Sequence, residues 1–285
     1  MGNWIRRRLR GVGLAIATCV LVMGCGVFAQ LAPPTTSNLH LLLGNPSQAT
    51  SVRWSANNFL ITRPQYALSY NREQGIPNWV SWQLNQDWLG DLPRSQFVAD
   101  PSLPDDWYAV SPDDYTGSGF DRGHIVPAAD RNRTLADSQS VFWMTNIVPQ
   151  APDNNQGPWE RFERYCRDLV RNEGKELYMI SGGAEVGGIG LQGDRSHIGT
   201  GRVTVPALLW KIAVVLERPG LGLAGVTADT RVIAVIMPNQ QGIRADDWRS
   251  YRRSVDLLEQ VTGYNFLSEL STSLQALLET QVDQQ

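Results

Sequence analysis

Cysteine and histidine are scarce in this chain of 285 residues, and these shortages exclude or disfavour particular kinds of site. Two of the three cysteines, Cys19 and Cys25, lie near the N-terminus, in a segment that we interpret below as a leader. Cys166 is then the only thiol of the mature chain, which excludes an internal disulfide and a zinc–cysteine cluster. The three histidines lack the spacing of zinc-hydrolase motifs, so a zinc-dependent hydrolase is disfavoured.

Apolar runs long enough to cross a membrane are also missing near the N-terminus. The apolar segment 11–23 is too short to span a bilayer comfortably, and it lies between an arginine-rich start and small residues. This pattern predicts a signal peptide over residues 1–29, cleaved before Gln30. Residues 22–25 also resemble a lipoprotein box, so a lipid anchor through Cys25 stays open as the alternative. Either outcome predicts a secreted or periplasmic protein without a stable membrane span in its mature form.

Positive charge is in short supply outside this leader. The full sequence has a net charge of −3. The first thirty residues hold four arginines and no acid, so removing them leaves 21 basic against 28 acidic residues, a net charge of −7. Long-range attraction cannot draw so acidic a protein to nucleic acid, so contact must be local, through clustered arginines and a metal ion.

Hydrophobic patterning predicts a mixed α+β domain. Apolar residues make up 42% of the chain, which allows a sizeable core. Aromatic and β-branched residues predict strands at 66–70, 79–84, 141–148, 210–216 and 230–236. Helical spacing of apolar residues predicts helices at 158–172 and 246–262. Strands outnumber helices and their turns are short, so we expect a central antiparallel sheet flanked by helices.

The same patterning predicts how the chain is divided. A linker rich in proline and threonine is expected at residues 30–39, after the leader. A single domain should then run from residue 40 to residue 270. Residues 271–285 are polar and are expected to form a C-terminal tail.

The predicted helix at 158–172 carries two charged side chains beside its apolar stripe. Glu163 and Arg167 are one turn apart and therefore adjacent on the helix surface. They could form an ordinary intrahelical salt bridge that flanks the core. Alternatively, they could be a half-buried pair held rigidly at the rim of a cleft. Cys166 falls on the apolar side of this helix, where a buried structural thiol is expected.

A glycine-rich segment at 188–193 matches the dinucleotide-binding pattern Gly-x-Gly-x-x-Gly. That motif needs a strand directly before it and a helix directly after it. The residues that follow, 194–201, are unsuited to starting a helix, so we interpret the segment as a surface loop. His197 within it is expected to be exposed and non-catalytic.

Four motifs in a fixed order carry a resemblance to a known family. The segment 115–127 contains the tetrapeptide Asp-Arg-Gly-His at positions 121–124, and it is followed by Met-Thr-Asn-Ile-Val-Pro-Gln at 144–150. Pro-Asp-Asn-Asn at 152–155 and the helical segment 159–167 come next. The chain thereby resembles the sugar-non-specific DNA/RNA endonucleases with a ββα-metal active site, above all their secreted cyanobacterial nuclease A branch. The similarity extends from about residue 40 to residue 266.

This resemblance implies a one-metal hydrolytic site. His124 would be the general base that deprotonates water, a role that suits an imidazole titrating near neutrality. Asn155 would bind one Mg²⁺ or Mn²⁺, because magnesium prefers hard oxygen ligands and usually keeps several waters. Glu163 would act through metal-bound water rather than touch the metal.

The resemblance also implies the phosphate contacts. Arg94, Arg122 and Arg167 would bind the phosphate, because guanidinium groups match its oxygens in a bidentate manner. Asp121 and Asn146 would brace the site.

Taken with the family's activity, the motifs predict a secreted endonuclease that cuts single- and double-stranded DNA and RNA and leaves 5′-phosphate ends. A dedicated protein inhibitor in the producing cell and a monomeric state are further expectations. The competing class is a non-catalytic envelope protein that binds nucleic acid or another polyanion. A protein that only binds would have no use for a neutral metal ligand beside a base.

Overall fold

The computed structural model describes residues 38–285, and the expected leader and most of the linker lie outside this range. Seven strands form one sheet in which every neighbouring pair is antiparallel. In spatial order they are β1 (Phe59–Thr62), β2 (Ala67–Asn71), β3 (Ile76–Leu84), β6 (Glu176–Ala184), β11 (Leu208–Leu216), β12 (Arg231–Pro238) and β13 (Arg252–Arg253). The predicted α+β fold with a central antiparallel sheet is confirmed.

Shorter strands and the helices surround this sheet. Three two-stranded sheets pair β4 (Asp121–His124) with β5 (Ile147–Gln150), β7 (Gly188–Gly190) with β8 (Gly193–Arg195), and β9 (His197–Ile198) with β10 (Val203–Thr204). The helices are α1 (Leu135–Val141), α2 (Pro152–Asn154), α3 (Glu160–Glu173), α4 (Val255–Thr262) and α5 (Thr272–Glu279). None of the helices in residues 38–285 is long and apolar enough to cross a bilayer.

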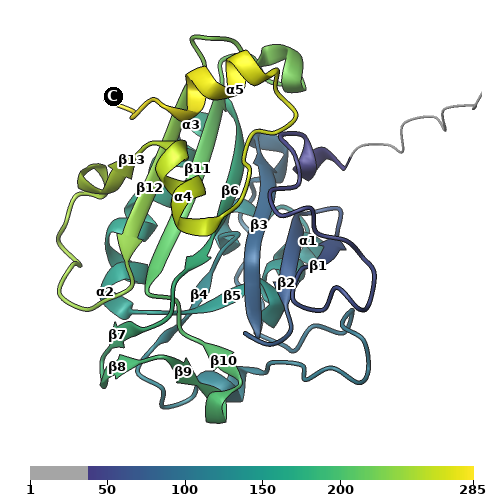
Figure 1. Ribbon diagram of the computed structural model, residues 1–285, viewed down its shortest axis with the longest axis vertical. Coiled ribbons are helices and arrows are strands. Elements are labelled where there is room, and N and C mark those ends of the chain that lie inside the picture. Colours follow the sequence, from purple (N-terminus) through teal and green to yellow (C-terminus); the bar gives the residue numbers. More distant parts are fainter. Residues whose placement is uncertain (1–37) are drawn as a thin grey trace, which may run out of the picture. The chain divides into compact units, whose positions relative to one another are not determined.

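Both faces of the sheet are buried, so its central strands are apolar almost without interruption. Helix α3 packs on one face, whereas α4 and α5 cover the other (Figure 1). Side chains of a strand point alternately to its two faces. In β11, Leu209 and Ala213 therefore join the core under α3, while Trp210 and Ile212 join the core under α4 and α5.

Helix α3 forms because its sequence supplies both a packing face and a stop. Phe162, Cys166, Leu169 and Val170 recur at helical spacing and are all buried. The helix ends at Gly174, which adopts a left-handed backbone (φ +66°) that favours glycine. The helix expected at 158–172 is thus present, two residues later at its start.

The strand predicted at 141–148 is wrong. Its first residue instead ends helix α1, which starts where the Thr134 side chain accepts a hydrogen bond from the Asp137 N–H. A 3₁₀ turn follows at Met144–Asn146, and only residues from Ile147 onward form strand β5. The segment is buried and apolar as a strand would be. Before Asn146, however, its backbone meets a neighbouring segment at a single bridge, where Phe142 and Met144 bond Val98, and it otherwise bonds mainly within turns.

The helix predicted at 246–262 is also shorter than expected. Its first part is a 3₁₀ turn at Trp248–Tyr251, followed by the two residues of β13. Helix α4 begins only after Ser254, whose side chain accepts a hydrogen bond from the Leu257 N–H.

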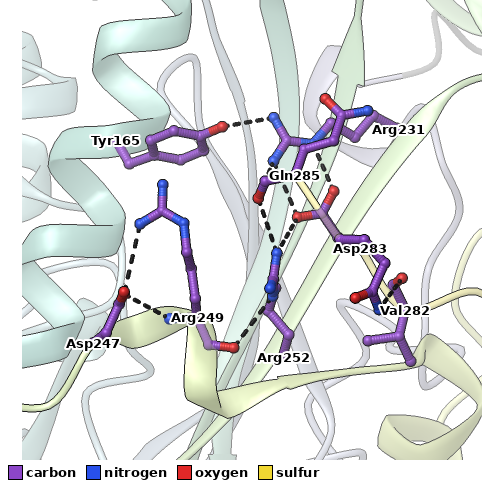
Figure 2. A network of polar contacts seen from close by, with 9 residues as sticks. Tyr165, Arg231, Asp247, Arg249, Arg252, Val282, Asp283 and Gln285 are labelled. Carbon is purple, nitrogen blue, oxygen red and sulfur yellow. Dashed lines mark hydrogen bonds and ion pairs between the residues drawn. The ribbon is translucent and has the colours of Figure 1, made fainter.

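Residues 271–285, expected to form a polar tail, instead contain helix α5 and pack on the domain. Leu278 and Asp283 are buried. The Asp283 carboxylate accepts hydrogen bonds from Arg231 at 2.7 Å and from Arg252 at 3.3 Å (Figure 2). Two arginines of the sheet edge therefore hold the end of the chain, an interaction that local composition does not reveal.

His40 is buried where η1 (Leu39–Leu41) meets the sheet. Its Nε2 lies 2.7 Å from the Pro64 carbonyl oxygen, and its Nδ1 accepts from the Gln83 N–H at 3.2 Å. The bond that Nδ1 accepts requires the neutral ring, with its proton on Nε2. Burial, with a smaller contribution from Arg131, lowers the pKa of His40 to about 4.

We expect this histidine to make the domain less stable in mild acid. Between its unfolded pKa of about 6.5 and its folded pKa of about 4, the unfolded chain binds a proton that the folded chain does not. Stability is then lost as pH falls through this window, by roughly 2 kcal/mol at pH 5. Urea unfolding at pH 7 and pH 5 should show a smaller difference for His40→Gln than for wild type. The exposed His197→Gln should behave as wild type, and equal pH effects in all three proteins would contradict the assignment.

Candidate active site

The tetrapeptide at 121–124 forms strand β4 and pairs in register with strand β5. Arg122 and His124 are two residues apart, so both side chains leave the same face of the strand. Gly123 faces the opposite side, where a Cβ atom would lie only 2.2 Å from Oε1 and 2.5 Å from Cβ of Gln150. Glycine is therefore the residue that lets β4 approach β5 closely and presents its two neighbours.

Asn155 follows helix α2 and starts a π-helical turn, Asn155–Trp159, that leads into α3. Its Nδ2 donates a hydrogen bond to Asp121 Oδ2 at 2.8 Å. Asp121 is an acceptor only, so this contact fixes which end of the amide faces strand β4. The Asn155 oxygen is left free to accept a ligand.

Six of the residues expected in the site line one cavity of about 480 Å³. They come from the segment before β4, from β4 itself, from the π-helical turn and from α3, and they are Arg94, Arg122, His124, Asn155, Glu163 and Arg167. Gln156, Glu160 and residues 127–129 also line the cavity. Residues up to 73 positions apart in sequence therefore meet in one place.

Asp121 and Asn146 do not line the cavity; Asp121 contacts a residue that does, and Asn146 contacts segments next to it. Asp121 bonds Asn155, as described. Asn146 is fully buried, and its side chain accepts from the Val126 N–H at 2.9 Å and donates to the carbonyl oxygens of Val126 and Val141. This amide ties the residues just after His124 to the end of α1.

His124 occupies an aromatic corner of the cavity. Its ring centroid lies 5.1 Å from that of Phe97 and 4.7 Å from that of Phe142. Burial lowers the pKa of His124 to about 3, with the nearby charge of Arg94 as a smaller cause, so the imidazole is neutral near pH 7. Its Nε2 is buried and has no hydrogen-bond partner among residues 38–285. A buried nitrogen without a partner is costly unless a water or ligand satisfies it.

Glu163 and Arg167 each form an ion pair outside the helix. Glu163 Oε1 lies 3.0 Å from Nζ of Lys211, and Arg167 Nη1 lies 3.0 Å from Oδ1 of Asp130. Burial raises the pKa of Glu163, while Lys211 acts in the opposite direction. Burial alone would lower the pKa of Arg167, but Asp130 and Glu163 raise it. Glu163 and Arg167 thus form no salt bridge with each other, and both line the cavity.

The sequence gives no direct sign of Asp130 and only a weak sign of Lys211. Lys211 is one of two lysines. It interrupts the apolar strand β11 on the face that α3 covers. Such an interruption suggests a partner but does not say which element supplies it.

Arg94 and Arg122 keep their positive charges available to the cavity. Neither forms an ion pair with a carboxylate in the described part of the chain. Arg122 donates to the Pro112 carbonyl oxygen at 3.0 Å and lies over the Phe97 ring, and Arg94 lies over the Phe142 ring. The two guanidinium groups are thus oriented by neutral partners.

The glycine-rich segment at 188–193 does not line the cavity. It forms most of the β7–β8 hairpin, with no helix after it, and His197 is exposed. This agrees with a surface segment and not with a dinucleotide-binding turn.

Comparison with known proteins identifies the family. The family model for DNA/RNA non-specific endonucleases matches residues 44–273. A Nostoc protein named Nuclease is 48% identical over 277 residues, which cover 95% of this chain and 97% of that protein. The nuclease of Serratia marcescens is 28% identical over 79% of this chain and 81% of its own length.

The chain belongs to the DNA/RNA non-specific endonuclease family. It is therefore an enzyme that hydrolyses nucleic acids, with the metal dependence of its family. A solved structure of an EndoG/EndoGI complex has a TM-score of 0.67 with this chain at 22% identity and covers 84% of it and 94% of its own chain. That likeness agrees with the ββα-metal fold.

The cavity of this endonuclease suits a metal ion that keeps most of its waters. Asn155 offers a neutral amide oxygen, and Glu163 has a second carboxylate oxygen besides the one that contacts Lys211. In the described residues, the one group of three close metal-ligating side chains is Asp256, Glu259 and Glu279 on α4 and α5, outside this cavity. A hard cation with few protein ligands, such as Mg²⁺, fits this donor set.

The close approach at Gly123 predicts the effect of adding one methyl group there. Gly123→Ala should push β4 away from Gln150, lowering the unfolding free energy by about 1–3 kcal/mol, as overpacking typically does. Because the neighbours of Gly123 line the cavity, nucleic-acid cleavage should fall as well. Thermal unfolding and plasmid cleavage measure the two effects. Wild-type values of both would show that β4 can shift without moving the site.

Proposed function

We propose that this endonuclease is secreted and hydrolyses phosphodiester bonds of single- and double-stranded DNA and RNA by a one-metal mechanism, leaving 5′-phosphate ends. The observation that supports this best is a single cavity lined by all the groups needed. They are a neutral histidine, an amide whose oxygen is not bonded to Asp121, a carboxylate and three arginines. These are the parts that hydrolysis of a phosphodiester by water requires.

His124 is the general base in this proposal. It lines the cavity, and its neutral ring has a free electron pair at neutral pH. An imidazole of low pKa is a weak base. The negative charge of an arriving phosphate offsets the repulsion from Arg94, however, and so raises the proton affinity of the ring when substrate is bound.

Asn155 holds the cation, one Mg²⁺ or Mn²⁺ per site, and Glu163 orients water in its shell. The cation supplies positive charge that stabilises the transition state and the 3′ leaving oxygen. A neutral ligand such as Asn155 leaves that charge undiminished. Asp121 keeps the amide in the orientation that presents its oxygen, because it binds the other end.

Arg94, Arg122 and Arg167 bind the scissile phosphate. Arg167 is fixed by Asp130, whereas the other two are oriented by aromatic rings and a carbonyl group. Contacts to phosphate position a nucleic acid without reading its bases, so little sequence preference is expected. The same contacts serve DNA and RNA.

Secretion or periplasmic export, a monomeric state and control by a dedicated protein inhibitor complete the proposal. The leader pattern of residues 1–29 supports export, with the lipid anchor through Cys25 as the alternative. The solved EndoG/EndoGI structure concerns inhibition of EndoG. A protein inhibitor of the present endonuclease can be sought on that basis.

Metal-dependent cleavage of both nucleic acids is the first test of this proposal. The assay is incubation with supercoiled plasmid and with RNA, in the presence of Mg²⁺ or of EDTA. The enzyme should cut both substrates only with the metal. Binding without cleavage under every metal condition would overturn the proposal.

Replacing His124 tests the base directly. His124→Ala should keep its fold and metal affinity but lose about 10²–10⁴-fold in turnover, the usual contribution of a general base. His197→Ala is the matched control, because that exposed histidine lies outside the cavity. Added imidazole should restore part of the activity of His124→Ala only. Near wild-type plasmid cleavage by His124→Ala would remove the base from the mechanism.

Metal and phosphate roles should separate in a magnesium titration. Asn155→Ala should raise the Mg²⁺ concentration for half-maximal rate by roughly 10–100-fold or more, since losses in and around a metal shell have effects of this size. Arg122→Ala should lower the rate at saturating Mg²⁺ without moving the midpoint. Indistinguishable titration curves for the two variants would contradict this division of roles.

A further inference from the structure

Lys211 is a buried cation in a position where an apolar side chain is expected. It lies in the middle of β11, and its side chain is 0% exposed. Its neighbours on the same face, Leu209 and Ala213, belong to the apolar core under α3. Moving an ammonium group into such surroundings costs several kcal/mol even after the protein relaxes. The position therefore needs an explanation beyond packing.

The partners of the ammonium group all belong to the active-site side of the sheet. Nζ lies 3.0 Å from Glu163 Oε1, 4.1 Å from the ring centroid of Trp159 and 5.4 Å from that of Trp82. Glu163 is its one carboxylate partner among the described residues. Trp159 closes the π-helical turn that begins at Asn155, so the same ammonium group contacts both segments that supply metal-site residues.

The ion pair explains how Glu163 can present a carboxylate to the cavity at all. Its side chain is 12% exposed and lines the cavity, and burial alone favours the uncharged acid. Arg167, one turn along α3, does not neutralise it directly, because its guanidinium pairs with Asp130. Asp130 is held in turn by the Trp82 Nε1–H at 3.0 Å. Lys211 thus supplies the opposite charge for Glu163 and engages one of its two oxygens, which leaves the other for the cavity.

Stability alone is a weak reason for such a pair. A buried ion pair is often no more stabilising than apolar residues of similar volume, whereas removing one partner strands the other charge. A function at the site gives the lysine a reason to be present.

We propose that Lys211 is a positioning residue that fixes the Glu163 carboxylate where it lines the cavity, through their ion pair, and thereby sets the affinity of the enzyme for its catalytic cation. This inference rests on the proposed role of Glu163 beside the metal. It assigns no contact between Lys211 and the substrate.

The chain offers a matched control, because it has only one other lysine. Lys175 pairs with the exposed Glu217 at the surface. Lys211→Met and Lys175→Met remove the same charge and differ in place. We expect Lys211→Met to bind Mn²⁺ roughly 10–100-fold more weakly in an electron paramagnetic resonance titration of the purified protein, and to shift the Mg²⁺ midpoint of plasmid cleavage in parallel. Lys175→Met should match wild type. Wild-type Mn²⁺ affinity in Lys211→Met would overturn the inference.

A double-mutant cycle shows whether Lys211 acts through Glu163. Glu163→Gln should itself weaken Mn²⁺ binding, and adding Lys211→Met should weaken it no further. A further loss in the double variant would assign Lys211 a general structural role and overturn the inference. This comparison stands even if Lys211→Met does not fold alone, because the double variant leaves no stranded charge.

The same cycle separates the two proposals. If Glu163→Gln binds Mn²⁺ as wild type does, the role of Glu163 in the proposed mechanism fails first. If Glu163→Gln weakens binding and Lys211→Met does not, only the positioning role of Lys211 fails.

Discussion

The site depends on one constraint, which is that charged side chains on the inner face of α3 must be neutralised where they are buried. Helix α3 packs its apolar stripe on the sheet, so Glu163 and Arg167 at the edge of that stripe cannot rely on water alone. Lys211 from β11 and Asp130 from the segment before α1 supply the opposite charges. The four groups form two ion pairs between the apolar core and the cavity. We call these four residues the wall of the cavity, because the core lies on one side of them and the polar site on the other.

A second set of contacts connects the β4–β5 pair to this wall through side-chain amides. Gln150 at the end of β5 donates to Asn154 Oδ1 at 2.7 Å, and Asn154 donates to the Pro238 carbonyl oxygen at the end of β12. Asn239 accepts from the Ala151 N–H and donates to the Pro149 carbonyl oxygen. The segment between β5 and α2 is thereby bound to the edge of the main sheet. These contacts position Asn155, the next residue.

The sequence predicts those site residues that belong to continuous motifs. It does not predict the partners that come from distant segments. The motif around His124 and the helix carrying Glu163 and Arg167 are each continuous in sequence, so spacing and family resemblance locate them. Lys211 lies 48 residues from its partner, and no periodicity pairs them. The strand expected at 141–148 failed for a related reason. Apolar content reports burial, whereas the backbone of this segment bonds mainly within turns and to Val98, and its Val141 carbonyl accepts from the Asn146 side chain.

The thiol of Cys166 lies on α3 between Glu163 and Arg167, and its reactivity can report on the packing of this helix. The side chain is 1% exposed, and burial raises the pKa of the thiol to about 12, so the folded protein hides it from alkylating or disulfide reagents in two ways. It can react only when α3 lifts from the sheet. Because no other cysteine is present in residues 38–285, the labelling rate reports how often that helix opens, with or without a cation or nucleic acid bound, and no engineered probe is required.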